Sequence, residues 1–253
     1  MKNYGIKREN DIIDALNNKR FYELNPNLKL FVNFLFKNNK ADSIVQCERM
    51  YGYPKPDFKI TTNNKTRYVS MKSGATKCIH SETIQNFISY LRNEGITDET
   101  LKTILLYQFG DLTLDGSGKE RYSLNEILKP LKERIEKANK ELNSNLGFIL
   151  KFTDRCFFTG LKHTTTPADT VYYGTYEKGV AVTNIQIFNY VLHKNWNFYT
   201  LLHIGPFLLR PGARYAHKEI LQPRRRFIIY AEWPKFYEKI NDIIKYSHNK
   251  SIA

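Results

Sequence analysis

Two short runs of strand-forming residues, separated by a tight polar turn, constrain the fold of this chain more than any other feature. Residues 57–62 and 67–72 alternate between apolar and polar side chains. Asn63-Asn64-Lys65 between them has the composition of a turn. A hairpin would therefore bring Asp57, at the outer end of the first run, beside Lys72, at the outer end of the second.

Apolar spacing predicts the other elements of secondary structure. Helices are expected at residues 6–17, 28–36, 124–142 and 235–246, and Ser81 is expected to cap another helix that carries Ile84, Phe87, Ile88 and Leu91. Residues 101–109 predict a buried strand. From Phe148 onwards, short apolar or aromatic runs alternate with turn-forming residues. Four of these runs predict strands at residues 148–152, 171–173, 198–204 and 227–233. The pattern indicates an α/β protein with a strand-rich C-terminal half.

The charge balance indicates a polyanionic partner. Lysine and arginine number 39 against 25 acids, which gives a net charge of +14. A basic protein with no special partner would have the same balance. Hydrophobic residues make up 42% of the chain, which argues against disorder.

Several protein classes are disfavoured by what the sequence lacks. Cys47, Cys78 and Cys156 are far apart and odd in number, so a disulfide framework is not expected. The N-terminus has no signal-like apolar stretch and no run is long enough to span a membrane, so we expect a cytoplasmic protein without a membrane partner. Without a glycine-rich phosphate loop, no nucleotide cofactor is expected.

An acid and a lysine side by side suit phosphodiester hydrolysis, in which a metal held by carboxylates and a nearby cation act on water and phosphate. Here residues 6–110 resemble the PD-(D/E)xK nuclease superfamily. Pro56-Asp57 matches the first element of its motif, and Ser70-Met71-Lys72 matches the second with serine in place of the acid. The resemblance implies a restriction-endonuclease-like core, in which a mixed sheet is flanked by helices. It also implies Mg²⁺ as cofactor, with Mn²⁺ able to substitute.

Serine at position 70 removes one carboxylate from the motif. One branch of restriction enzymes has the pattern SxK and takes a glutamate from the following helix, and the resemblance assigns that role to Glu82. Catalytic positions would then be Asp57, Lys72 and Glu82, supported by Ser70 and Gln85. Each of these residues also has an ordinary structural reading, such as a solvated strand lysine or an acid in a first helical turn.

The superfamily often adds an acid from its first helix. Glu9 is the candidate, because it shares a helical face with the inward-pointing Ile12, Ile13 and Leu16. An acid beside a buried stripe is costly unless it has a partner such as a metal. The rivals are Glu48 and, less favoured, Glu23. The expected metal ligands are therefore Asp57 and Glu82, with Glu9 as a further candidate.

Basic residues gather in the C-terminal half, where arginine can clamp phosphates or read guanine. The expected DNA-binding residues, which could equally form a solvated basic face, are Arg210, Arg214, Lys218, Arg224, Arg225 and Arg226. The sequence thus predicts a nuclease core at 1–112, a helical connector at 113–147 and a DNA-recognition region at 148–253 packed on the core.

The expected function is Mg²⁺-dependent cleavage of double-stranded DNA by a restriction or other defence endonuclease, with a homodimer as a possible assembly. Two alternatives stay open. The first is a non-catalytic nucleic-acid-binding protein on a decayed nuclease fold, which the missing acid at position 70 motivates. The second is a nuclease of RNA or single strands, which the basic and aromatic composition permits.

Overall fold

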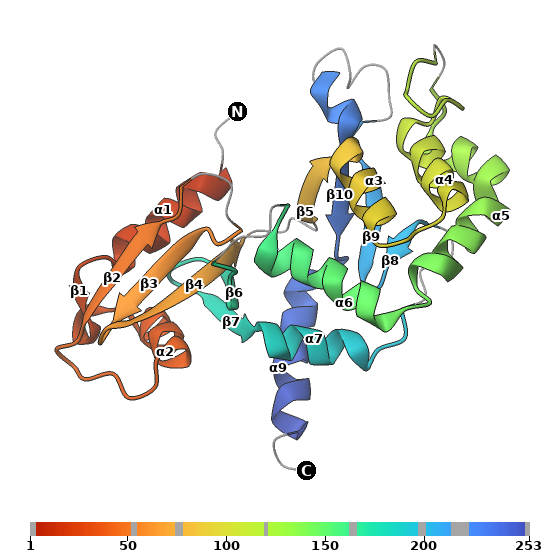
Figure 1. Ribbon diagram of the computed structural model, residues 1–253. Helices are drawn as coiled ribbons and strands as arrows, with labels where there is room; N and C mark the ends of the chain where they lie inside the picture. The colour runs from red at the N-terminus through yellow and green to blue at the C-terminus, as the bar shows by residue number, and fades with distance from the viewer. Residues whose placement is uncertain are drawn as a thin grey trace. The chain divides into compact units, whose positions relative to one another are not determined.

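The computed structural model describes residues 4–51, 55–73, 78–118, 121–161, 166–196, 201–213 and 223–250 of a mixed α/β protein (Figure 1). The chain divides into two compact units. Unit 1 comprises Met1–Thr76, Thr153–Tyr190 and Lys235–Ala253, and unit 2 comprises Lys77–Phe152 and Val191–Pro234. The units therefore do not follow the contiguous ranges 1–112, 113–147 and 148–253, because the chain leaves unit 1 and returns to it twice.

Unit 1 is built on a six-stranded sheet in the order β1-β2-β3-β4-β6-β7. Neighbouring strands are antiparallel except β4 and β6, which run parallel. The strands are β1 (Lys19–Arg20), β2 (Ile44–Arg49), β3 (Phe58–Thr62), β4 (Lys65–Lys72), β6 (Thr170–Gly174) and β7 (Gly179–Thr183). The helical segments are α1 (Tyr4–Leu16), η1 (Phe21–Glu23), α2 (Pro26–Leu35), η2 (Arg155–Thr159), α7 (Asn184–Leu192) and α9 (Phe236–Lys250).

The expected hairpin is confirmed as β3 and β4. Asn63 and Asn64 form its turn with φ angles of 50° and 59°, a left-handed conformation that asparagine tolerates better than most residues. The alternate side chains Phe58, Ile60, Val69 and Met71 are buried in one cluster with the apolar faces of α1 and α2. Burial of that single face fixes the register, because a shift by one residue would expose every one of these side chains.

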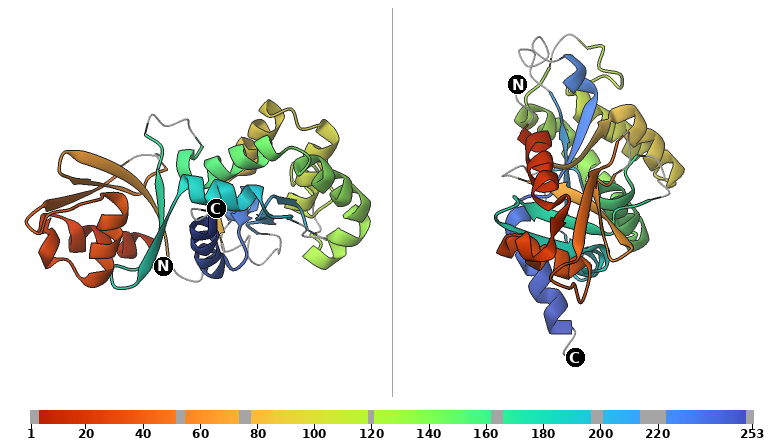
Figure 2. Two further views of the ribbon diagram at one scale, coloured as in Figure 1. Left: turned by 90° about the horizontal axis from the view of Figure 1, so that it is seen from below. Right: turned by 90° about the vertical axis from the view of Figure 1, so that its left-hand side faces the viewer.

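Unit 2 contains a four-stranded antiparallel sheet in the order β5-β10-β9-β8. Its strands are β5 (Cys78–Thr83), β8 (His203–Ile204), β9 (Phe207–Pro211) and β10 (Ile228–Glu232), and its helical segments are α3 (Ile84–Asn93), α4 (Asp98–Phe109), α5 (Leu124–Leu142), α6 (Leu146–Asp154) and η3 (Pro223–Phe227). Helices α4 and α5 lie side by side (Figures 1 and 2).

Two predicted strands are wrong, because both segments are helices. Residues 101–109 belong to α4, which has Asp98 and Glu99 in its first turn and ends at the left-handed Gly110. This helix buries polar as well as apolar side chains and therefore lacks a clear apolar stripe. Residues 148–152 belong to α6, whose Phe148 N–H donates to the Asn145 side chain at 3.2 Å.

The strands predicted at residues 171–173 and 227–233 are confirmed as β6 and β10. The run at 198–204 yields only β8 at its end, and residues 198–200 lie outside the described residues. The C-terminal half also contains α6, α7 and α9, so it is mixed in composition. Among the described residues, no helix has the length and apolar character needed to cross a membrane.

Candidate functional site

Several charged residues gather at one end of the unit 1 sheet. Strands β2, β4 and β6 point in the same direction, because β3 lies antiparallel between β2 and β4 while β6 is parallel to β4. Their last residues therefore lie at the same end of the sheet as Asp57, which immediately precedes β3. Arg49 ends β2, Lys72 ends β4, and Tyr173 is the neighbour of Lys72 on β6.

The backbone holds Asp57 rigidly at this end. Its N–H donates to the Val69 carbonyl at 2.8 Å, and its Oδ2 accepts a hydrogen bond from the Met71 N–H at 2.5 Å. Among the described residues, Oδ1 has no hydrogen-bond donor. The carboxylate is thus fixed through one oxygen, which leaves the other oxygen for a ligand.

Ser70 orients Lys72. The Lys72 Nζ donates to the Ser70 Oγ and to the Met71 carbonyl, both at 3.1 Å. Ser70 is fully buried, whereas Lys72 is only half-buried. The serine that replaces the motif acid therefore takes part as a hydrogen-bond acceptor for the lysine, and a buried neutral hydroxyl does not neutralise the charge of Lys72.

Glu9 joins this cluster from α1. Its Oε2 accepts from Arg49 Nη2 at 2.6 Å, and each of these side chains is 24% exposed. Burial raises the pKa of Glu9, the charge of Asp57 raises it further, and Arg49 and Lys72 oppose the rise. We name Glu9, Arg49, Asp57 and Lys72 the sheet-end cluster, since the charges of the other three act on Glu9.

Because the pKa of Glu9 is raised, the stability of the protein should depend on pH through this residue. A carboxyl whose folded pKa is raised stabilises the protein below its ordinary pKa and loses that contribution as the pH rises through the folded value. Glu9→Gln, which mimics the protonated acid, should therefore be at least as stable as the native protein at pH ~7 in EDTA, and its advantage should shrink towards pH ~4. Urea unfolding at both pH values measures this.

The control for that experiment is Glu48→Gln, because Glu48 is exposed on the neighbouring strand β2 and pairs with Lys59 at 3.1 Å. Its removal breaks only a surface ion pair and should change stability at pH ~7 little. A Glu9→Gln variant that is clearly less stable than the native protein at pH ~7 would contradict the electrostatic description of the cluster.

The two rival acids have ordinary structural roles. Glu48 forms its ion pair with Lys59 on the surface of the sheet. The Glu23 carboxylate accepts from the Arg20 N–H at 2.6 Å and caps the short helix η1. Neither is among the charges that shift the pKa of Glu9. Of the alternatives to Glu82, Glu9 is therefore the one whose charge couples to Asp57 and Lys72.

Glu82 and Gln85 lie in unit 2. The expectation that Ser81 caps a helix beginning with Glu82 is wrong, since both residues lie in β5 and Thr83 caps α3 through the Asn86 N–H at 3.2 Å. Gln85 is exposed on α3. Whether Glu82 supplies the displaced carboxylate stays a prediction.

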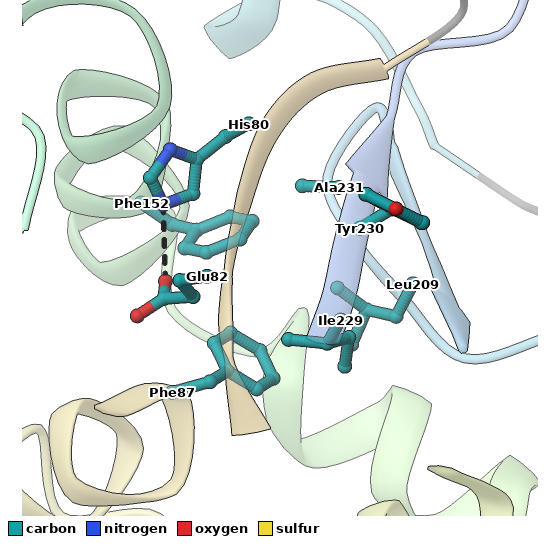
Figure 3. Close-up of a pocket in the computed structure, with 8 residues that line it drawn as sticks. All are labelled: His80, Glu82, Phe87, Phe152, Leu209, Ile229, Tyr230 and Ala231. Atoms are coloured by element: carbon teal, nitrogen blue, oxygen red, sulfur yellow. Dashed lines mark hydrogen bonds and ion pairs between the residues drawn. The ribbon is translucent and has the colours of Figure 1, made fainter. Parts of the chain in front are cut away.

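Glu82 has a buried partner within its own strand. Its Oε1 lies 3.1 Å from His80 Nε2, and its side chain is only 1% exposed. Figure 3 shows the two side chains facing each other beside the rings of Phe87 and Phe152. The space that these residues share with β9 and β10 is too small for a water molecule. A carboxylate with this little exposure needs such a hydrogen bond to stay buried.

The described residues contain no group of three or more histidine, cysteine, aspartate or glutamate side chains that could hold a metal ion. Magnesium, however, keeps several of its waters and can be bound by one or two carboxylates together with substrate phosphates. Asp57 and Glu9 fit this smaller requirement, because their charges repel each other and a cation between them would relieve that repulsion.

The basic residues predicted to bind DNA differ in their surroundings. Arg224 and Arg225 are exposed on η3, and Arg210 on β9 pairs with Glu232 at 3.2 Å. Arg226 forms an ion pair at 3.1 Å with Asp111, a fully buried carboxylate. Arg214 and Lys218 lie outside the described residues. Arg226 therefore has a structural partner within unit 2.

Sequence reasoning missed two members of this end of the sheet. Arg49 pairs with Glu9 across forty positions of chain, and Tyr173 reaches Lys72 through the parallel pairing of β4 with β6. Burial raises the pKa of Tyr173 and the charge of Arg8 opposes that rise, which places Arg8 nearby as well.

No family model matches this chain, and no curated protein matches it either.

Proposed function

We propose that this protein is a Mg²⁺-dependent endonuclease that hydrolyses phosphodiester bonds of DNA. The observation that carries the proposal is the sheet-end cluster, in which Asp57, Lys72 and Glu9 interact at one end of a mixed sheet. Pro56-Asp57 at the start of the β3–β4 hairpin and Ser70-Met71-Lys72 at its end carry the resemblance to the PD-(D/E)xK superfamily, on which the proposal also rests. The net charge of +14 supports a polyanionic substrate.

The residues of the cluster divide the chemistry among them. A bound Mg²⁺, held by Asp57 and Glu9, would supply charge neutralisation and an activated water. Lys72, fixed by Ser70, would place its ammonium against the water or a phosphate oxygen. The Arg49 Nε is buried without a hydrogen-bond partner among the described residues, which leaves one donor unsatisfied at this end of the sheet. Water attacks phosphorus and releases a proton to solvent, the P–O bond to one of the two sugar oxygens breaks, and that oxygen takes up a proton from solvent.

Cleavage of supercoiled plasmid DNA tests this proposal. We expect nicked or linear product with Mg²⁺ or Mn²⁺ and none with excess EDTA. Without a bound cation, the carboxylates of Asp57 and Glu9 would repel the phosphate of the substrate. A panel of duplex DNA, single-stranded DNA and RNA decides between the nuclease alternatives. If no substrate of the panel is cut with either metal, the proposal of a nuclease is wrong.

A second candidate is a nucleic-acid-binding protein that has lost catalysis on the same fold. Ser70 in place of the motif acid and the ion pair between Arg49 and Glu9 favour it. This candidate predicts tight, salt-dependent binding of nucleic acid that is the same with Mg²⁺ and with EDTA. Binding that strengthens with Mg²⁺ and weakens in Asp57→Asn would favour the nuclease.

A further inference from the structure

The three consecutive arginines of η3 have different roles. Arg226 is anchored, because its Nη2 donates to Asp111 Oδ2 at 3.1 Å and its carbonyl accepts from Gln108 Nε2 at 2.9 Å. The same Gln108 nitrogen also donates to the Ile228 carbonyl at 2.9 Å. Asp111 and Gln108 are buried, so η3 is held by polar groups that are costly to separate.

Aromatic and loop contacts complete the anchor. The Arg226 guanidinium carbon lies 5.9 Å from the ring centroids of both Phe109 and Phe227, whose own centroids are 5.9 Å apart in an edge-to-face arrangement. Gly116, with φ +77°, lets the loop at 111–118 close over Arg226, since a Cβ there would lie 2.8 Å from its Nη2. The backbone on both sides of Phe227 is therefore held by Gln108, and its ring lies against Phe109 and the Arg226 guanidinium.

What this anchor holds at the surface is an aromatic ring that directly follows three arginines in the chain. Phe227 is 46% exposed although its ring packs against the ring of Phe109, and Arg224 and Arg225 precede it with exposed side chains. The loop that covers Arg226 adds the exposed Leu112 and Leu114. A half-exposed ring next to guanidinium groups provides the two contacts that unpaired nucleic acid needs, which are a stacking face for a base and cations for the phosphates.

We propose that Arg224, Arg225 and Phe227, which we name the η3 platform, bind an unpaired base of a nucleic acid and its flanking phosphates. This rests on the proposed nucleic-acid substrate and narrows it to strands in which a base is unstacked, such as a single strand or a frayed or distorted duplex. Arg226 acts as a positioning residue that does not itself contact the ligand.

The alternative partner for exposed apolar and basic side chains is an anionic membrane surface. Asp115 disfavours it, because this exposed acid lies in the same loop as Leu112 and Leu114. Hydrogen bonds from Ser117 hold the pKa of Asp115 below its usual value, so the carboxylate is charged at neutral pH. Insertion of the loop into lipid would have to desolvate this charge, whereas nucleic acid leaves it in water.

Binding in EDTA tests the platform independently of cleavage. Fluorescence anisotropy with a single-stranded oligonucleotide and its blunt duplex should show tighter binding of the single strand. Phe227→Leu, which keeps an apolar side chain but removes the ring, should weaken single-strand binding by roughly tenfold or more and duplex binding much less. Phe227→Tyr should restore the preference. Arg224→Gln with Arg225→Gln should weaken both and reduce the salt dependence.

Tyr22→Leu is the matched control, because Tyr22 is an aromatic of similar exposure on η1 of unit 1, and it should leave binding unchanged. Equal losses for single strand and duplex in Phe227→Leu, or no loss, would overturn the proposal, as would platform-dependent binding to phosphatidylserine vesicles alone. Plasmid cleavage without a single-strand preference would overturn the platform but leave the nuclease proposal intact. A preference for the single strand without cleavage of any substrate would support the platform and contradict the nuclease proposal.

Discussion

Lys72→Ala should lower the rate of Mg²⁺-dependent DNA cleavage by about a hundredfold or more, the size of effect seen when one preorganised electrostatic contact to a transition state is removed. The ammonium is held by Ser70 and Met71 and points to the end of the sheet where Asp57 is fixed. Affinity for DNA should change little, because the variant loses only one of many cations. Single-turnover cleavage and anisotropy in EDTA measure the two effects separately.

Lys59→Ala provides the matched control on the neighbouring strand β3. Its ammonium pairs with Glu48 on the surface, and we expect native cleavage rates from this variant. Comparable losses in Lys59→Ala and Lys72→Ala would show a general effect of charge. A collapse of DNA binding in Lys72→Ala would instead assign the lysine to substrate capture.

Asp111→Ala should destabilise the protein by about 3–5 kcal/mol, because it leaves buried cations without their counter-charge. The carboxylate is fully buried and faces Arg226 at 3.1 Å and Arg121 at 3.7 Å, and Arg121 is itself only 5% exposed. Its two oxygens also accept from the N–H groups of Thr113 and Gly118. Urea unfolding gives the difference in free energy.

Asp115→Ala is the control for Asp111→Ala within the same loop. Asp115 is exposed, so its removal should leave the midpoint of urea unfolding nearly unchanged. Asp111→Ala should also weaken single-strand binding through the η3 platform at temperatures where the variant is folded. A loss of stability below about 1 kcal/mol would contradict the description of Asp111 as the buried anchor of η3.

The sequence predicts the parts of the fold whose signals are local. The β3–β4 hairpin is specified by alternation and by the Asn63-Asn64 turn, and α5 is confirmed over its predicted length. Residues 101–109 were misassigned because a helix buried on most of its surface has no polar face to reveal its period. The two units could not be predicted, because each combines segments far apart in the chain.

The residues of the candidate site also differ in whether a local sequence signal could reveal them. The hairpin alone suffices to place Asp57 near Lys72, and the helical pattern of α1 made Glu9 a candidate. Arg49 and Tyr173 could not be found, because they reach the site through pairings with distant segments. A buried serine as the hydrogen-bond acceptor of Lys72 has no signal in the sequence beyond the missing acid.

The most direct test of the sheet-end cluster is the single-turnover cleavage rate of Asp57→Asn with Mg²⁺, compared with the native protein at saturating concentration. Asparagine keeps an oxygen for the Met71 N–H and has nearly the same shape, so the hairpin should persist. We predict native affinity for DNA in EDTA and cleavage slowed by about a hundredfold or more. Cleavage at the native rate would contradict a phosphodiesterase site at this end of the sheet.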